Sequence, residues 1–169
     1  MPPAPTLFAQ GIAAPEWTVD CWFNAAHAPT VAGLRGRVIV IEAFQMLCPA
    51  CVSHGLPQAT RVYDMFDSTD VAVVGLHAVF EHHEVMGPAA LEVFFHEYRI
   101  RFPVGVDASG GASTVPITMK AYVLEGTPTM VLVDRNGHIR AKHLGAVSDL
   151  QLGSEIAALV YEQAGSVVG

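Results

Sequence analysis

The chain has 169 residues, of which 51% are hydrophobic and 15% are charged. That length is sufficient for one compact domain with a sizeable core, and the apolar composition excludes an intrinsically disordered chain. Nine Lys and Arg against sixteen Asp and Glu give a net charge of −7, which disfavours binding to the phosphate backbone of nucleic acid. Apolar runs such as 38–41 are far shorter than the roughly 20 residues of a membrane-spanning helix, so no membrane insertion is expected.

The N-terminal segment differs in composition from the rest of the chain. Residues 1–16 are rich in Pro and Ala, so we expect an extended arm there and a single domain over 17–169. No basic residue precedes an apolar stretch near Met1, and the sequence as given therefore predicts no secretory leader and a cytoplasmic location. An exported, periplasmic protein whose leader has been removed is the alternative.

Strand and helix patterns then alternate along the chain. Residues 38–44 are apolar and mostly β-branched apart from Glu42, which is typical of a buried parallel strand. A helix is expected from Pro49 to about Phe66, with a kink at Pro57. The further elements expected are a strand over 71–77, a polar loop over 81–87, a helix over 88–100, a strand over 102–107, a loop over 108–113, a helix over 117–123, a hairpin of strands 129–134 and 139–144, and a helix over 148–163. This βαβαβαββα order predicts an α/β domain around a central mixed β-sheet that is flanked by helices.

Three cysteines are too few for a framework of structural disulfides. Two of them form the motif Cys48-Pro49-Ala50-Cys51, a spacing that indicates redox or metal chemistry. A buried strand leads into Cys48 at the start of a helix, where unpaired N–H groups and the helix dipole stabilise a thiolate. Cys48 is therefore the candidate nucleophile, and Cys51, one turn further on, is the candidate resolving cysteine. Cys21 is expected to be a small apolar filler.

Several motifs follow one another in a recognisable order. They are Trp22-Phe23-Asn24, Leu34-Arg35-Gly36-Arg37 with the strand after it, Phe44 with the Cys48–Cys51 motif, Phe102-Pro103-Val104 with Asp107, Gly126-Thr127-Pro128-Thr129, and Asp134-Arg135-Asn136-Gly137. In this order, over roughly residues 22–165, they resemble the thioredoxin-like fold and, within it, the TlpA-like or redoxin-like thiol–disulfide oxidoreductases. Leu47 departs from that pattern, since the family has an aromatic residue just before its first cysteine.

The resemblance implies a substrate site beside the cysteines. Pro128 corresponds to the family's cis-proline, which faces the cysteine pair, and proline tolerates a cis peptide bond far better than other residues. Thr127 would present its backbone to an extended substrate, and Pro49 and Ala50 are expected to border the same site. The implied partners are protein thiols or disulfides and an upstream thiol protein or flavin-dependent reductase, with no organic cofactor in this chain.

The resemblance also gives a role to Glu42, which lies six residues before Cys48. It corresponds to a buried acid that carries a proton to or from the resolving cysteine, here Cys51. A lone carboxylate in an apolar strand should have a raised pKa, as a proton acceptor for a thiol requires.

Two alternatives remain at the level of sequence. In the first, Cys48, Cys51 and one histidine handle copper or zinc, because the segment 81–84 reads Glu-His-His-Glu and His77 ends a strand at the edge expected to carry Cys48. Solvation of a surface loop explains the same histidines, and His77 is also a candidate to modulate Cys48. In the second alternative the domain is a non-catalytic interaction module that retains the cysteine motif.

Overall fold

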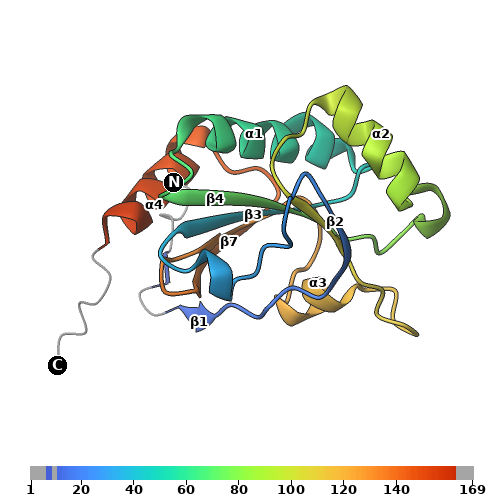
Figure 1. The fold of residues 1–169 in the computed structure, drawn as a ribbon, viewed down its shortest axis with the longest axis horizontal. Coiled ribbons are helices and arrows are strands. Elements are labelled where there is room, and N and C mark those ends of the chain that lie inside the picture. Colours follow the sequence, from blue (N-terminus) through green and yellow to red (C-terminus); the bar gives the residue numbers. More distant parts are fainter. Residues whose placement is uncertain (1–6, 9–10, 163–169) are drawn as a thin grey trace.

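The computed structural model describes residues 7–8 and 11–162. Within this range the chain forms a seven-stranded sheet of order β1-β7-β6-β3-β4-β5-β2, covered by helices on both faces (Figure 1). The predicted α/β class with a central mixed sheet flanked by helices is confirmed. Among the described residues, no helix is both long enough and apolar enough to cross a membrane.

The two central strands follow the sequence prediction residue by residue. Strand β3 spans Val38–Phe44 and is buried along its whole length, as its continuous apolar sequence requires. Strand β4 spans Val71–His77 and runs parallel to β3, with Phe44 opposite His77 at their carboxyl ends. The predicted hairpin is also present as β6, Thr129–Val133, and β7, His138–Leu144.

The edges of the sheet were not predicted. Strand β2, Val19–Phe23, pairs antiparallel with β5, Val104–Asp107, at one edge. Strand β1, Ile12–Ala13, pairs antiparallel with β7 at the other edge and lies within the arm expected over 1–16. The part of that arm formed by residues 1–6 and 9–10 lies outside the described residues.

Two layers of helices cover the sheet. The α-helices are α1, Leu56–Met65; α2, Pro88–Tyr98; α3, Ile117–Ala121; and α4, Asp149–Tyr161. Short 3₁₀ turns cover Ala32–Leu34 and His83–Val85, the latter within the loop expected over 81–87. Helices α1, α2 and α4 pack on one face, above the sheet in Figure 1, and α3 packs below it with the first 3₁₀ turn. The helix expected over 88–100 ends at Tyr98 because Arg99 takes a left-handed conformation with φ 53°.

The helix after the cysteines has an irregular start that the sequence predicted only in part. Residues Cys51–Gly55 form a π-helical turn, in which the Leu56 N–H donates to the Cys51 carbonyl, and the regular helix α1 begins only at Leu56. Pro57, which has no N–H to donate, therefore lies in the first turn of α1 rather than inside a continuous helix. The expected kink at Pro57 takes the form of this wider turn before it.

Candidate active site

The cysteine motif forms a tight turn at the carboxyl end of β3. The Cys48 N–H donates to the Gln45 carbonyl at 3.1 Å, and the Val52 N–H donates to the Cys48 carbonyl at 3.1 Å. The Cys51 N–H points at the Cys48 sulfur, with N and Sγ 3.3 Å apart. A backbone donor at a helix start stabilises negative charge on that sulfur, so the geometry suits Cys48 as a thiolate.

The two cysteines differ in exposure. Cys48 is half-buried, whereas Cys51 is fully buried in the core below it. Burial, together with the hydrogen bond to Cys48, raises the pKa of the Cys51 thiol to about 12. Cys48 is thus the sulfur that a partner can reach, and Cys51 needs help to lose its proton.

The loop before β6 lies against the cysteines. The Thr127–Pro128 peptide bond is cis, which confirms the prediction for Pro128. The Cys48 thiol contacts the Thr127 carbonyl oxygen at 3.6 Å, and the Thr129 hydroxyl fixes the loop by donating to the Gly126 carbonyl at 2.7 Å. The structure therefore brings Thr127 next to Cys48.

A groove of about 320 Å³ opens beside Cys48. Its lining residues are Gln45, Leu47, Cys48, Pro49, Phe80, Glu81, His82, Met86 and Thr127. Of the residues predicted for substrate binding, Pro49 and Thr127 line this groove, whereas the exposed Ala50 and the buried Pro128 are not part of its lining. The apolar Leu47 side chain is 54% exposed at the rim, where the related pattern has an aromatic residue.

Glu42 lies in the middle of β3 and is 1% exposed. Neither of its carboxylate oxygens has a hydrogen-bond partner. Burial, and after it the negative charge of Cys48, raises the pKa of this carboxyl well above its usual range. The carboxyl borders Gly55 of the π-helical turn and faces the Pro128 loop, so Glu42 lies among the elements that carry the cysteines and the cis-proline.

Gln45 is a buried polar residue of the site to which the sequence analysis gave no role. The Gln45 side chain accepts from the Phe80 N–H at 3.1 Å and donates to Glu81 at 3.4 Å, which ties the cysteine turn to the opposite wall of the groove. The signal available in the sequence was a polar residue directly between an apolar strand and the cysteine motif.

His77 ends β4 next to the cysteine turn, as expected. It is, however, neither a base nor a cation that acts on Cys48. Its Nε2 atom accepts from the Met46 N–H at 3.2 Å, which places the proton of the neutral ring on Nδ1, and Nδ1 has no partner. Burial lowers the pKa of His77 to about 4. The ring also packs on Phe44 at 5.1 Å between centroids. His77 therefore acts as a neutral acceptor that holds the backbone before Cys48.

The geometry gives no support to a metal centre. Within the described part of the chain, no group of three or more His, Cys, Asp or Glu side chains could hold a metal ion. His82 lines the groove, whereas His96 is an exposed partner of Glu97 on the surface of α2. Cys21 lies half-buried in β2 opposite Val106 of β5.

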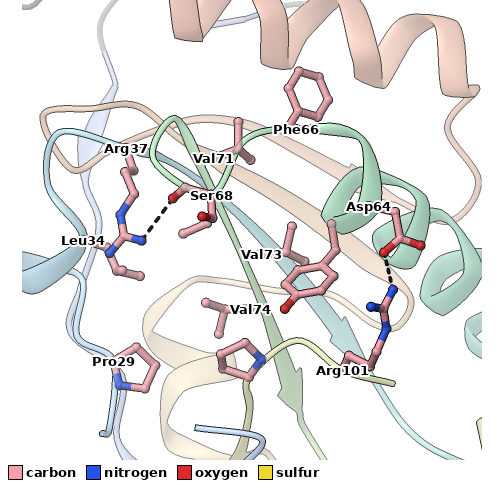
Figure 2. Close-up of a pocket in the computed structure, with 13 residues that line it drawn as sticks. Pro29, Leu34, Arg37, Asp64, Phe66, Ser68, Val71, Val73, Val74 and Arg101 are labelled. Atoms are coloured by element: carbon pink, nitrogen blue, oxygen red, sulfur yellow. Dashed lines mark hydrogen bonds and ion pairs between the residues drawn. The ribbon is translucent and has the colours of Figure 1, made fainter. Parts of the chain in front are cut away.

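A second hollow of about 430 Å³ lies at the opposite end of β4 (Figure 2). The start of β4, residues 71–74, lines it together with Tyr63, and Figure 2 shows Arg37 and Arg101 on opposite sides of it. Arg37 donates to the Ser68 carbonyl at 3.2 Å, and Arg101 pairs with Asp64. None of the predicted site residues lines this hollow, so the chemistry of the cysteines belongs to the groove at the other end of the strand.

Comparison with known proteins agrees with this geometry. No family model matches the chain. The crystal structure of the thioredoxin-like superfamily protein SPOA0173 is 56% identical, with a TM-score of 0.88 over 90% of this chain and 99% of that one. A thiol-disulfide isomerase from Corynebacterium glutamicum is 48% identical, with a TM-score of 0.85 over 89% of this chain and 98% of that one.

A more distant curated relative is the thiol-disulfide oxidoreductase ResA of Halalkalibacterium halodurans, which is 22% identical over 131 residues. The match covers 78% of this chain and 66% of ResA, so it spans just under two thirds of that relative. The fold and site together define an α/β protein with a redox-type cysteine pair, and the chain belongs to the thioredoxin-like superfamily. Within it, the chain is an enzyme of the thiol–disulfide oxidoreductase class.

Proposed function

We propose that this enzyme exchanges a Cys48–Cys51 dithiol or disulfide with the thiols and disulfides of other proteins. One observation carries the proposal: a half-buried sulfur, Cys48, lies in a groove, and the buried Cys51 directly behind it contacts that sulfur through its N–H at 3.3 Å. A partner disulfide can reach the first sulfur only, and the second is placed to displace the partner.

The reaction in the reducing direction has two displacement steps. The Cys48 thiolate attacks one sulfur of a substrate disulfide, so that a Cys48–substrate disulfide forms and one substrate thiolate leaves. The Cys51 thiol then loses its proton, and its thiolate attacks the Cys48 sulfur and releases the second substrate thiolate. Two electrons pass to the substrate, its two thiolates take up protons, and the protein is left with a Cys48–Cys51 disulfide.

Glu42 is proposed to accept the proton of Cys51 in the second step and to return it when the enzyme runs in the oxidising direction. Burial raises the pKa of the Cys51 thiol to about 12 and also raises that of the Glu42 carboxyl. Because the pKa of the carboxyl is raised, it lies closer to the pKa of the Cys51 thiol than that of an ordinary carboxyl does. Proton transfer from the thiol to Glu42 is therefore less unfavourable than transfer to an ordinary carboxylate.

The substrate site is proposed to consist of the Thr127 carbonyl, the adjoining Pro128, the groove residue Pro49 and its exposed neighbour Ala50. The Thr127 carbonyl beside Cys48 gives an extended substrate backbone a fixed hydrogen-bond acceptor.

Electrons for a reductase would come from the dithiol of another protein or from a flavin-dependent reductase.

A trapping experiment tests this proposal. We expect the Cys51→Ala variant to accumulate mixed disulfides with cellular proteins, because the substrate can no longer be displaced from Cys48. Cys48→Ser should abolish both trapping and turnover, and Cys21→Ser, a matched change outside the site, should leave both intact. Loss of reductant-sensitive adducts in Cys51→Ala, or their persistence in Cys48→Ser, would contradict the proposed roles.

A further inference from the structure

We infer that Gly55 is a positioning residue that provides the space in which the Glu42 carboxyl lies. The inference rests on the proposed role of Glu42 in proton transfer, and it assigns the π-helical turn Cys51–Gly55 two tasks. The turn begins with Cys51, the proposed resolving cysteine, and ends with Gly55, which leaves space for the carboxyl of Glu42, the proposed proton acceptor.

The observation behind this inference is a close approach of three segments. A Cβ atom added to Gly55 would collide with Glu42 Oε1, and it would lie 3.0 Å from Glu42 Cδ and 2.9 Å from Pro128 Cβ. Glu42 comes from β3, Pro128 from the loop before β6, and Gly55 from the π-helical turn, so the carboxyl fills the space that a side chain at position 55 would need. Contacts this short leave no room for even a methyl group unless the carboxyl moves and Pro128 shifts slightly.

The backbone of Gly55 does not itself require glycine. Its φ of −60° and ψ of −56° are ordinary right-handed helical values. Glycine is less favourable than alanine at such a position because it loses more conformational freedom on folding. A glycine here therefore carries a conformational cost, and the space that it leaves for Glu42 is the feature in the structure that offsets it.

The π-helical turn widens the helix at this point. The Leu56 N–H bonds to the Cys51 carbonyl five residues back instead of four, so one extra residue is inserted between the resolving cysteine and α1. Turns of this kind occur as single bulges in α-helices, frequently at functional sites. In this protein the widened turn begins at Cys51 and ends at Gly55, and Gly55 lies against the Glu42 carboxyl.

The surroundings leave the carboxyl few charged neighbours. Across the sheet, Glu42 pairs with Gly75 of β4 and Met130 of β6, and neither is charged. On the π-helical turn, Cys51 is the buried thiol and His54 is engaged with the Val147 carbonyl at 3.2 Å. Cys48 is the group whose charge acts on Glu42. Displacing the carboxyl from this space would change both its distance to the cysteines and its solvation.

The test compares the two displacement steps in Gly55→Ala. Because a displacement of about 1 Å can cost roughly a hundredfold in rate, we expect resolution of a preformed Cys48 mixed disulfide to slow at least about tenfold. Alkylation of Cys48 should stay within about twofold of the wild type. The pH at which resolution accelerates should fall, since a carboxyl pushed out of a dry space is better solvated and ionises at lower pH. Gly153→Ala is the matched control, because Gly153 is a helical glycine in α4 with open space around it.

Combining Gly55→Ala with Glu42→Ala shows whether slower resolution in Gly55→Ala is caused by displacement of the Glu42 carboxyl. We expect Glu42→Ala alone to slow resolution, and Gly55→Ala to slow it much less in that background than in the wild type, because only the 2.9 Å contact with Pro128 Cβ is then left to be relieved. The thermal midpoint should fall in Gly55→Ala, or the protein should fail to fold, and in the Glu42→Ala background the same change should lower the midpoint by less. This readout does not depend on activity.

The outcomes separate this inference from the proposed function. Slow resolution in Glu42→Ala together with wild-type rates and an unchanged midpoint in Gly55→Ala would overturn the role of Gly55 and leave the proton relay intact. Equal slowing by Gly55→Ala in the wild-type and Glu42→Ala backgrounds would also overturn it, since Gly55 would then act through another group. Unchanged resolution in Glu42→Ala would overturn both the relay and the inference.

Discussion

His77 shows how burial sets the chemistry of a side chain beside the cysteine turn. Its sequence position permits a base, a cation or a metal ligand, because an imidazole can play each role near neutral pH. In the structure the ring is 1% exposed, accepts a hydrogen bond from the Met46 N–H and has a pKa lowered to about 4. The neutral ring therefore contributes to the position of the turn rather than to its charge.

The lowered pKa of His77 predicts a specific acid sensitivity. An ordinary histidine has a pKa of 6.5, so below that pH the unfolded chain binds a proton that folded His77 does not. The stability from the neutral ring is fully present above pH 6.5 and is lost progressively as the pH falls toward 4, by up to about 3 kcal/mol. Urea unfolding measures this effect: between pH 7 and pH 4.5 the free energy of unfolding should fall less in His77→Phe than in the wild type. Equal losses in both proteins would show that His77 does not titrate this way.

The site residues fall into two groups by how they could be found from sequence. Cys48, Cys51 and Pro128 carry local motifs, and Glu42 stands out as the one charge in an apolar strand. Gln45 shows only as a polar residue between the apolar strand and the cysteine motif, and Gly55 carries no signal, because their roles come from contacts with Phe80 and Glu42 across the fold. A sequence pattern predicts residues whose role is set by their neighbours in the chain, and it misses those whose role is set by packing.

Among the secondary-structure elements, α3 depends on a side chain from another element. Its N-cap residue is Pro116, which offers no side-chain acceptor. The buried Asp107 carboxylate at the end of β5 accepts instead from the Thr118 N–H at 2.8 Å and the Met119 N–H at 2.7 Å. Asp107 therefore joins the sheet to the helix on its lower face.

Removing this cap should destabilise the protein by a measurable amount. We expect Asp107→Ala to lower the free energy of unfolding by about 1 to 2 kcal/mol, the usual cost of losing a helix cap. Asp107→Asn, which keeps one acceptor oxygen, should lose less. Denaturant unfolding of the three proteins at pH 7 measures the difference, and a change below about 0.5 kcal/mol in Asp107→Ala would contradict the capping role.

The accuracy of the sequence prediction also varies by element. Strands β3 and β4 matched at both ends because they lie inside the sheet and their apolar runs stop where burial stops. Strands β1 and β2 were missed because an edge strand is short, partly exposed and mixed in polarity, and β2 also carries an irregularity between Val19 and Cys21. The π-helical turn was predicted only as a kink, since Pro57 signals a break without specifying its geometry.

For the molecule as a whole, the topology concentrates the chemistry at one edge of the sheet. The parallel strands β3 and β4 end side by side at Phe44 and His77, and the cysteine turn follows the first of them. The loop before β6 reaches the same edge, since β6 is antiparallel to β3 and starts where β3 ends. Open α/β sheets bind ligands at the carboxyl ends of their parallel strands, and the candidate site lies at that edge.

A redox titration of the purified protein in thiol buffers, with free cysteines trapped by alkylation, tests the central claim most directly. We expect one reversible two-electron transition that protects Cys48 and Cys51 together, while Cys21 remains alkylated throughout. A midpoint near about −270 mV would mark a reductase and one near about −120 mV an oxidant. If no Cys48–Cys51 disulfide forms at any potential, or bound metal protects both thiols, thiol–disulfide exchange by this pair is contradicted.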